Sequence, residues 1–155
     1  MKKRNWFIVL PLTIVVLLCS CGDFGNETVS VGEEFETEGL KGRAVSVDED
    51  YTVPNDDYDL FKPESGYKFI MVDFSFENTG KSDEYVDVYD FKCYADDDTC
   101  EQHYYNDDWA KESQLSPGRS VSFSTIFEVP EDASSIELEY EPNWLSDQKI
   151  IIKIK

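Results

Sequence analysis

Apolar and polar residues alternate along most of the chain, and a repeat of two residues predicts β-strands rather than helices. The strictest example is Arg119–Val129, in which every second side chain faces the expected core and Glu128 points outward with the serines. Tyr67–Asn78 alternates in the same way, but Phe69 and Met71 add apolar side chains on its second face. We therefore expect this strand to be central and to be covered on both sides at that end.

The other strand segments repeat the pattern more briefly, and turn residues such as Ser116-Pro117-Gly118 separate them. No segment of useful length has the helical period of 3.6 residues. Seven or eight short strands of this kind predict an all-β chain, folded as an antiparallel β-sandwich whose two sheets bury their apolar rows against each other. The remaining predicted strands are Leu40–Val47, Tyr85–Tyr94, Thr99–Tyr105, Ile136–Tyr140 and Lys149–Ile154.

The N-terminus has the form of a bacterial lipoprotein signal. A basic start, Lys2–Arg4, precedes the apolar run Trp6–Leu18, which is shorter than the roughly 20 residues needed to span a bilayer. Leu18-Cys19-Ser20-Cys21 then resembles a lipobox, with a small residue directly before the acceptor cysteine. This predicts cleavage after Ser20 and lipidation of Cys21. An ordinary secretory signal and an uncleaved anchor are the alternatives.

This interpretation divides the chain into three parts: a signal peptide over residues 1–20, a lipidated tether over 21–35 and a β-sandwich domain over 36–155. The mature protein is then expected at the cell membrane, held on its extracytoplasmic face by lipid. One acyl chain anchors a protein only marginally, whereas several together hold it stably.

Cysteine usage agrees with an oxidising compartment. Of the four cysteines, Cys19 leaves with the signal peptide and Cys21 takes the lipid, so that Cys93 and Cys100 form an even pair. Disulfides persist outside the cytoplasm, where these two residues would be exposed to oxidation. Two free thiols are the alternative.

The spacing of this pair fits a β-hairpin. A four-residue loop over Ala95–Asp98 would place Tyr94 opposite Thr99 and Cys93 opposite Cys100. If the first of these pairs is hydrogen-bonded, the cysteines occupy a non-hydrogen-bonded position, where Cα atoms lie about 4.5 Å apart. A disulfide tolerates that separation.

The chain is strongly acidic, with a net charge of −19. Removing residues 1–20 takes away three basic residues and no acid, which leaves −22 (−19 minus 3). Such a charge opposes binding to nucleic acid or to an anionic membrane surface and favours divalent cations or a basic partner. A hydrated acidic surface with no ligand is the alternative.

Two regions concentrate the acids, Asp48–Glu64 and Asp96–Glu112. Clustered carboxylates in loops can supply the six to eight oxygens that calcium takes. If calcium binds, the expected ligands are Asp96, Asp97 and Asp98, although the ordered spacing of a calcium-binding loop is missing.

Three segments resemble one known family. Tyr67–Asn78 continues into Thr79-Gly80 and is similar to the "F-x-x-V-x-x-x-x-x-N-T-G" strand and turn of an immunoglobulin-like domain of unknown function in Gram-positive surface lipoproteins. Leu115–Ser120, with a strand ending at Pro130, and Ile136–Pro142 resemble its other signatures. The family is similar in fold to secreted immunoprotective antigens of mycobacteria. The resemblance implies an immunoglobulin-like sandwich outside the cell, with no catalytic residues to transfer.

The residues themselves offer no recognisable catalytic set. The single histidine, His103, is expected at the surface because the sequence identifies no nucleophile or metal motif to accompany it. We therefore expect a protein that is not an enzyme and that needs no cofactor, calcium excepted.

The expected function is that of an extracytoplasmic binding or interaction module for a protein or a cell-wall component. Its binding surface would be the acidic and aromatic connection Asp48–Gly66 together with strand edges, with the aromatic contacts Tyr51, Tyr58, Phe61 and Trp109. A stacking platform for sugar or peptide is a further possibility, formed by Tyr104, Tyr105, Trp109 and Trp144. The alternative function is a carrier of calcium or cell-wall sugar for a membrane-associated complex. A structural role at the surface is also open.

Overall fold

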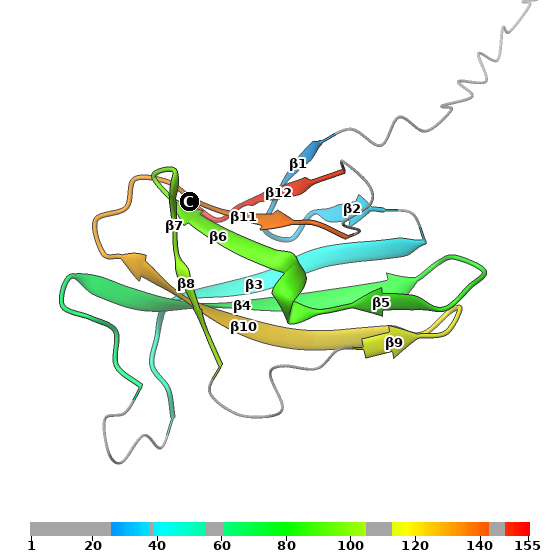
Figure 1. Ribbon diagram of the computed structural model, residues 1–155, viewed down its shortest axis with the longest axis horizontal. Helices are drawn as coiled ribbons and strands as arrows, with labels where there is room; N and C mark the ends of the chain where they lie inside the picture. The colour runs from blue at the N-terminus through cyan, green and yellow to red at the C-terminus, as the bar shows by residue number, and fades with distance from the viewer. Residues whose placement is uncertain (1–25, 38, 55–60, 105–112, 143–147) are drawn as a thin grey trace, which may run out of the picture.

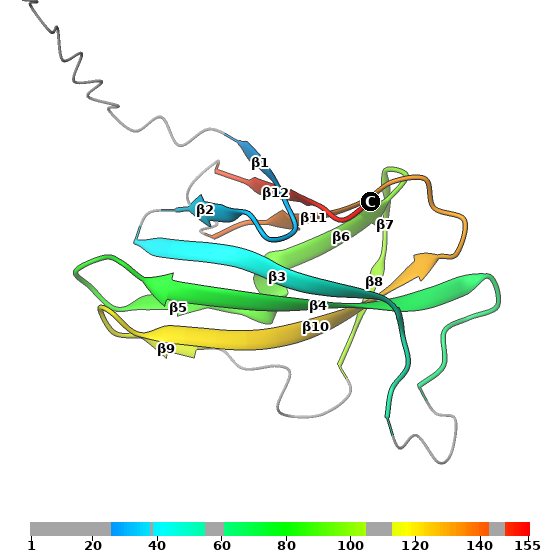
Figure 2. The ribbon, with the colours of Figure 1, turned by 180° about the vertical axis from the view of Figure 1, so that it is seen from behind.

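Two five-stranded sheets pack face to face in the computed structural model (Figures 1 and 2). The structure describes residues 26–37, 39–54, 61–104, 113–142 and 148–155. The predicted β-sandwich is confirmed, and the only helical element among these residues is a single 3₁₀ turn, η1 (Val88–Asp90). The expected signal peptide and Cys21 lie outside the described residues.

The first sheet contains, in spatial order, β1 (Glu27–Ser30), β12 (Ile150–Lys153), β11 (Ile136–Tyr140), β6 (Phe91–Ala95) and β7 (Asp98–Thr99). Its pairings are antiparallel except for β1 and β12, which run parallel. These two strands come from opposite ends of the chain, so no hairpin constrains their direction. β1 falls within the expected tether, and Val29 is buried there.

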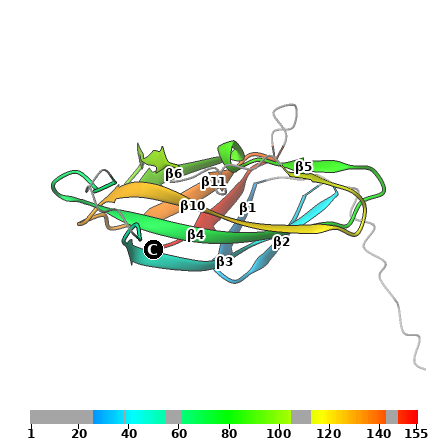
Figure 3. The same ribbon diagram turned by 90° about the horizontal axis from the view of Figure 1, so that it is seen from below.

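The second sheet contains, in spatial order, β2 (Glu34–Glu36), β3 (Leu40–Tyr51), β4 (Tyr67–Asn78), β10 (Ser120–Pro130) and β8 (Glu101–His103). A small additional sheet pairs β5 (Glu84–Val86) with β9 (Ser113–Leu115). Seen from below, β3, β4 and β10 lie in front of β6 and β11 (Figure 3). The expected count of seven or eight strands is exceeded because two predicted strands are divided and because β1, β2 and β9 lie outside the predicted strands.

One division has a clear local cause. Asp87 interrupts the predicted strand Tyr85–Tyr94 because its carboxylate accepts the Tyr89 N–H at 3.0 Å, while Asp90 accepts the Asp87 N–H at 3.1 Å. This reciprocal capping stabilises η1 and ends β5. The chain then re-enters the first sheet as β6.

Aromatic side chains fill the centre of the sandwich. Phe74 and Phe76 on β4 contact Phe91 on β6, and Phe91 stacks on Tyr140 of β11 with 4.7 Å between ring centroids. Each of these rings is almost completely buried. Burial of large aromatic surface from both sheets is the main force that holds the layers together.

A second, smaller cluster lies on the outer face of the second sheet. Val53, Phe69 and Ile126 are buried there, and Tyr51 and Phe61 pack against them. The prediction that Tyr67–Asn78 is covered on both faces near Phe69 is confirmed. Side chains on the outer face of β10 are covered in the same way, since Ile126 lies in this cluster and Glu128 accepts a hydrogen bond from the backbone N–H of Glu64.

Candidate functional site

An acidic pocket of about 350 Å³ opens at one end of the sandwich. It lies where the turn between β6 and β7 approaches the end of β10 and the start of β4. Six carboxylate side chains line it, and no lysine or arginine is among its lining residues: Glu64, Asp96, Asp98, Glu101, Glu128 and Asp132, with Tyr67, Ala95, Thr99, Cys100 and Pro130. The pocket is therefore suited to a positively charged ligand.

The pocket exists because one strand changes sheets. β7 pairs with β6 in the first sheet. β8 follows β7 after a single intervening residue and pairs with β10 in the second sheet. Cys100 is the residue between them. The crossing places Asp98, on one sheet, close to Glu101, on the other, and both line the same pocket.

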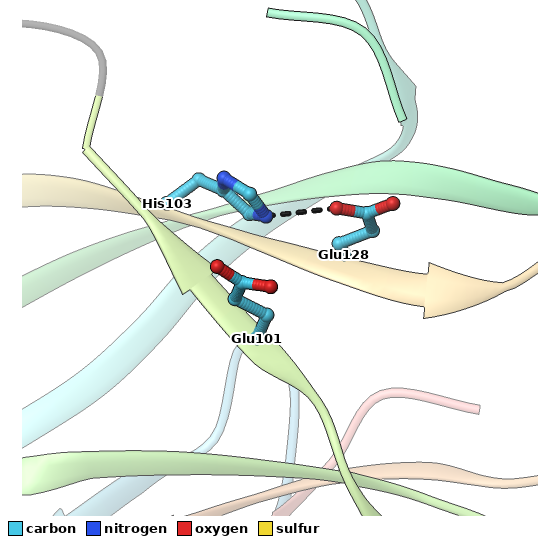
Figure 4. Close-up of side chains that lie close together, drawn as sticks. All are labelled: Glu101, His103 and Glu128. Carbon is cyan, nitrogen blue, oxygen red and sulfur yellow. Dashed lines mark ion pairs between the residues drawn. The ribbon is translucent and has the colours of Figure 1, made fainter. Parts of the chain in front are cut away.

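Two of the lining residues, Glu101 and Glu128, form a cluster with His103 beside this pocket (Figure 4). Glu101 lies directly opposite Glu128 in the pairing of β8 with β10, and His103, two residues further along β8, points to the same face. Potential ligand atoms of the three residues all lie within 4.8 Å of one another. Among the described residues, this is the one such group of three or more histidine, cysteine or acidic side chains.

Glu128 is the buried member of the group, with 8% of its surface exposed. Its Oε1 accepts the backbone N–H of Glu64 at 2.6 Å, and its Oε2 lies 2.8 Å from Nε2 of His103. The sequence pattern predicted that this side chain points away from the main core, and it does. The connection that carries Glu64 covers it.

His103 is half-buried, and its ring packs on Phe69 with 5.1 Å between centroids. Although Nε2 lies close to Glu128, it is buried and makes no well-aligned hydrogen bond with any described residue. His103, expected at the surface, is thus only partly exposed and has an acidic neighbour that the sequence did not reveal. The spacing Glu101-x-His103 within a strand was the available signal, but the pairing with Glu128 could be known only from the sheet register.

The expected calcium ligands Asp96, Asp97 and Asp98 are not gathered into one cluster of neighbouring ligand atoms in the described structure, and calcium binding stays a prediction. Asp96 instead accepts the backbone N–H groups of Ser134 and Ser135 at 2.9 Å, and these hydrogen bonds lower the pKa of its carboxyl group. Its oxygens stabilise the chain before β11.

The cysteine hairpin also differs from the expected one. Its loop has two residues, not four: Asp96 and Asp97 both have positive φ, as in a type I′ turn, and Ala95 pairs with Asp98. Cys93 does lie opposite Cys100, but in a hydrogen-bonded pair, because the Cys100 N–H donates to the Cys93 carbonyl at 2.9 Å. Both are free cysteines in this structure.

Of the expected aromatic surface, Tyr51 and Phe61 are half-buried and pack against the outer cluster. Tyr58 and Trp109 lie outside the described residues, as do Tyr105 and Trp144 of the expected stacking platform. Tyr104 is half-buried and donates a hydrogen bond to Gln102 at 2.7 Å. Its burial raises the pKa of its hydroxyl to about 12.

The comparison with protein families supports the resemblance inferred from the motifs. Residues 29–150 match the model of a domain of unknown function, DUF4352. The chain belongs to this family. No curated protein matches the sequence.

Solved structures share the fold. The protein ycdA of Bacillus subtilis, assigned as a lipoprotein, superposes with a TM-score of 0.65 at 24% identity over 79% of this chain. This chain spans 38% of the length of ycdA. The protein yjhA of Bacillus subtilis gives a TM-score of 0.62 at 16% identity, covering 81% of this chain and 98% of its own.

The secreted protein MPT63 of Mycobacterium tuberculosis gives a TM-score of 0.55 at 13% identity, covering 81% of this chain and 95% of its own. The predicted similarity in fold to secreted mycobacterial antigens is thus confirmed. Within the described residues, no helix is both long and apolar enough to cross a membrane.

Proposed function

We propose that this protein is a non-enzymatic, lipid-anchored module that binds a basic partner outside the cell. The observation that carries the proposal is the pocket of about 350 Å³ with six carboxylates and no basic lining residue. The charge of −22 expected for the mature chain would attract the same kind of partner over longer distances. Lysine or arginine side chains on a protein are the ligands that this chemistry favours.

An oligolysine peptide provides a direct test. The full chain in detergent should bind it, and the variant Asp98→Asn with Asp132→Asn should bind about fivefold more weakly, because two carboxylates of the pocket lose their charge. The pair Glu27→Gln with Glu77→Gln removes the same charge from exposed positions outside the pocket. Equal weakening by both pairs, or no binding at all, would contradict a pocket-specific role.

A second candidate function, that of a ligand carrier, is favoured by the same six lining carboxylates, since calcium takes six to eight oxygen ligands. Calorimetry with calcium and with cell-wall fragments tests it on the same preparation. Saturable heat with either would support the carrier and count against a simple interaction module.

The anchor proposal has its own test. Mass spectrometry of the protein from membranes should find an N-terminus at Cys21 that carries acyl groups. Cys21→Ala should abolish both the modification and membrane retention. An intact N-terminus at Met1 would contradict the proposed processing.

A further inference from the structure

We infer that Glu101, His103 and Glu128 form a binding site for a divalent transition-metal ion, and that Zn²⁺ is the ion whose ligand preferences they fit. The inference does not depend on a basic partner. It concerns His103 and two carboxylates that line the pocket, Glu101 and Glu128, and metal binding can be tested without any other molecule.

The pairing of β8 with β10 brings the three proposed ligands close together. Glu101 and Glu128 are cross-strand neighbours, and His103 follows Glu101 on the same face, so the three side chains converge on one point (Figure 4). Their ligand atoms lie within 4.8 Å of one another. Tetrahedral ligands at about 2.1 Å from Zn²⁺ are about 3.4 Å apart, so small side-chain rotations suffice to close the site.

The electrostatics of the site call for a cation. Two carboxylates directly opposite each other on neighbouring strands repel, and Glu128 is buried, which strengthens the repulsion. The other charged side chains that line the pocket are acids as well: Glu64, Asp96, Asp98 and Asp132. A divalent ion between Glu101 and Glu128 would convert this repulsion into attraction.

His103 is the member of this cluster that is not an acid. Its Nε2 is buried and lies at ion-pair distance, 2.8 Å, from Glu128 Oε2, but no aligned hydrogen bond joins it to a described residue. A buried polar atom without a hydrogen bond is costly, and coordination of a metal would use its lone pair. Contact of the ring with Phe69 holds this nitrogen toward the carboxylates.

A backbone hydrogen bond orients the carboxylate of Glu128. The backbone N–H of Glu64 donates to its Oε1, which leaves Oε2 directed at the cluster. Hydrogen bonds of this kind to a ligand carboxylate fix its direction and typically contribute to metal affinity. The ligand pair Glu128 and His103 is thus held in place from two sides.

The mixture of ligands selects the ion. Imidazole nitrogen suits zinc and its neighbours in the first transition row, whereas calcium and magnesium prefer oxygen ligands alone. Three protein ligands leave at least one coordination position for water or for a group from a partner. Glu101 is exposed and lines the pocket, so that this position would be reachable from solvent.

Calorimetry with ZnCl₂ on the full chain in detergent, after chelator treatment, tests the inference. We expect one high-affinity equivalent per chain, with binding at least about tenfold weaker in His103→Gln and in Glu101→Gln. Glu137→Gln is the matched control, because Glu137 lies on β11, away from the cluster. The experiment is repeated with Cys93→Ala and Cys100→Ala combined, since thiols also bind zinc, and this variant should keep the site.

Because the chain has a single histidine, the ¹⁵N signals of its imidazole report directly whether the ring binds the metal. In ¹⁵N spectra of the imidazole, Zn²⁺ should shift Nε2 in the wild type and in the double cysteine variant, whereas Ca²⁺ should not. Absence of zinc binding, equal affinity in His103→Gln, loss of the site with the cysteines, or an unshifted imidazole would each overturn the inference. The Asp98 and Asp132 double variant keeps all three ligands, so it separates failure of the basic-partner proposal from failure of this one.

Discussion

At the scale of single residues, the side chain of Asn78 stabilises the turn Asn78-Thr79-Gly80 through hydrogen bonds. The residue is completely buried, and its Nδ2 donates to the carbonyl oxygens of Leu115 at 2.6 Å and Ser82 at 2.8 Å. Its Oδ1 accepts the Gly80 N–H at 2.8 Å. One amide therefore joins the end of β4 to the turn after it and to β9, which neither aspartate nor a hydrophobic residue could do.

We expect Asn78→Ala to lower the free energy of unfolding by about 2–3 kcal/mol, because it leaves buried carbonyl groups without donors. Urea denaturation measures this change. The neighbouring Thr79→Ala is the control, since Thr79 is exposed and its hydroxyl makes only a 3.5 Å contact with the Gly39 carbonyl. Equal effects of the two substitutions would show that the amide contributes nothing specific.

Tyr140 differs from Asn78, because its buried polar group is not satisfied by hydrogen bonds from the described residues. Its hydroxyl is buried in the aromatic core, has no hydrogen-bond partner among the described residues, and has its pKa raised by that burial. Removing an unsatisfied buried group relieves a desolvation cost. Tyr140→Phe should therefore stabilise the protein by about 1 kcal/mol in the same denaturation experiment. A loss of stability would mean that the hydroxyl does have a partner.

At the scale of elements, the β6–β7 hairpin brings two thiols together at the edge of the main core, where Cys93 is buried and Cys100 packs against the core. The hydrogen bond from Cys93 lowers the pKa of Cys100, which is half-exposed, whereas that bond and burial raise the pKa of Cys93. Cys100 is thus the thiol that ionises first and begins any oxidation. Opposite residues in a hydrogen-bonded pair have Cα atoms about 5.5 Å apart, which a disulfide can span.

We predict that the pair forms a disulfide in an oxidising compartment and that this bond raises the free energy of unfolding by about 2 kcal/mol, as expected for a short closed loop. Thiol counting on the denatured protein, before and after a reductant, detects the bond. The melting temperature should fall on reduction in the wild type and stay constant in the double cysteine-to-alanine variant. Two free thiols after equilibration with an oxidant would refute the prediction.

At the scale of the whole molecule, charge opposes the compact state. The mature chain expected after cleavage carries −22, and a large net charge of one sign destabilises a folded protein through self-repulsion. Local ion pairs offset part of it, for example Lys149 between Glu139 and Glu141 at 2.7 and 2.9 Å. Such pairs on the surface contribute little each.

Raising sodium chloride from low to physiological concentration should therefore stabilise the fold by about 1 kcal/mol, or about 4 °C in melting temperature, because the salt screens this repulsion. Thermal denaturation at neutral pH measures the effect. Near the pI of the full sequence, about 4.2, the net charge is small and the same salt step should change little. A melting temperature that falls with salt at neutral pH would show that attractive pairs dominate.

Much of the architecture follows from side-chain order alone. Alternation at every second position determines that the segments are strands and which face of each is buried, because a pleated strand has no other way to sort its side chains. For the same reason the sequence predicted the two-sided burial near Phe69 and the juxtaposition of Cys93 and Cys100. Both depend on local geometry.

The candidate metal site could not be predicted from this alternation, since its ligands come from two segments that are distant in the chain. Glu101 and Glu128 become neighbours only through the sheet register, and Glu128 is buried only because the connection carrying Glu64 covers it. The change of sheet at Cys100 likewise depends on how the layers pack. The sequence by itself thus determined the strands and their apolar faces, whereas the tertiary structure alone decided which polar side chains meet, because alternation specifies a direction for each side chain but not its neighbour.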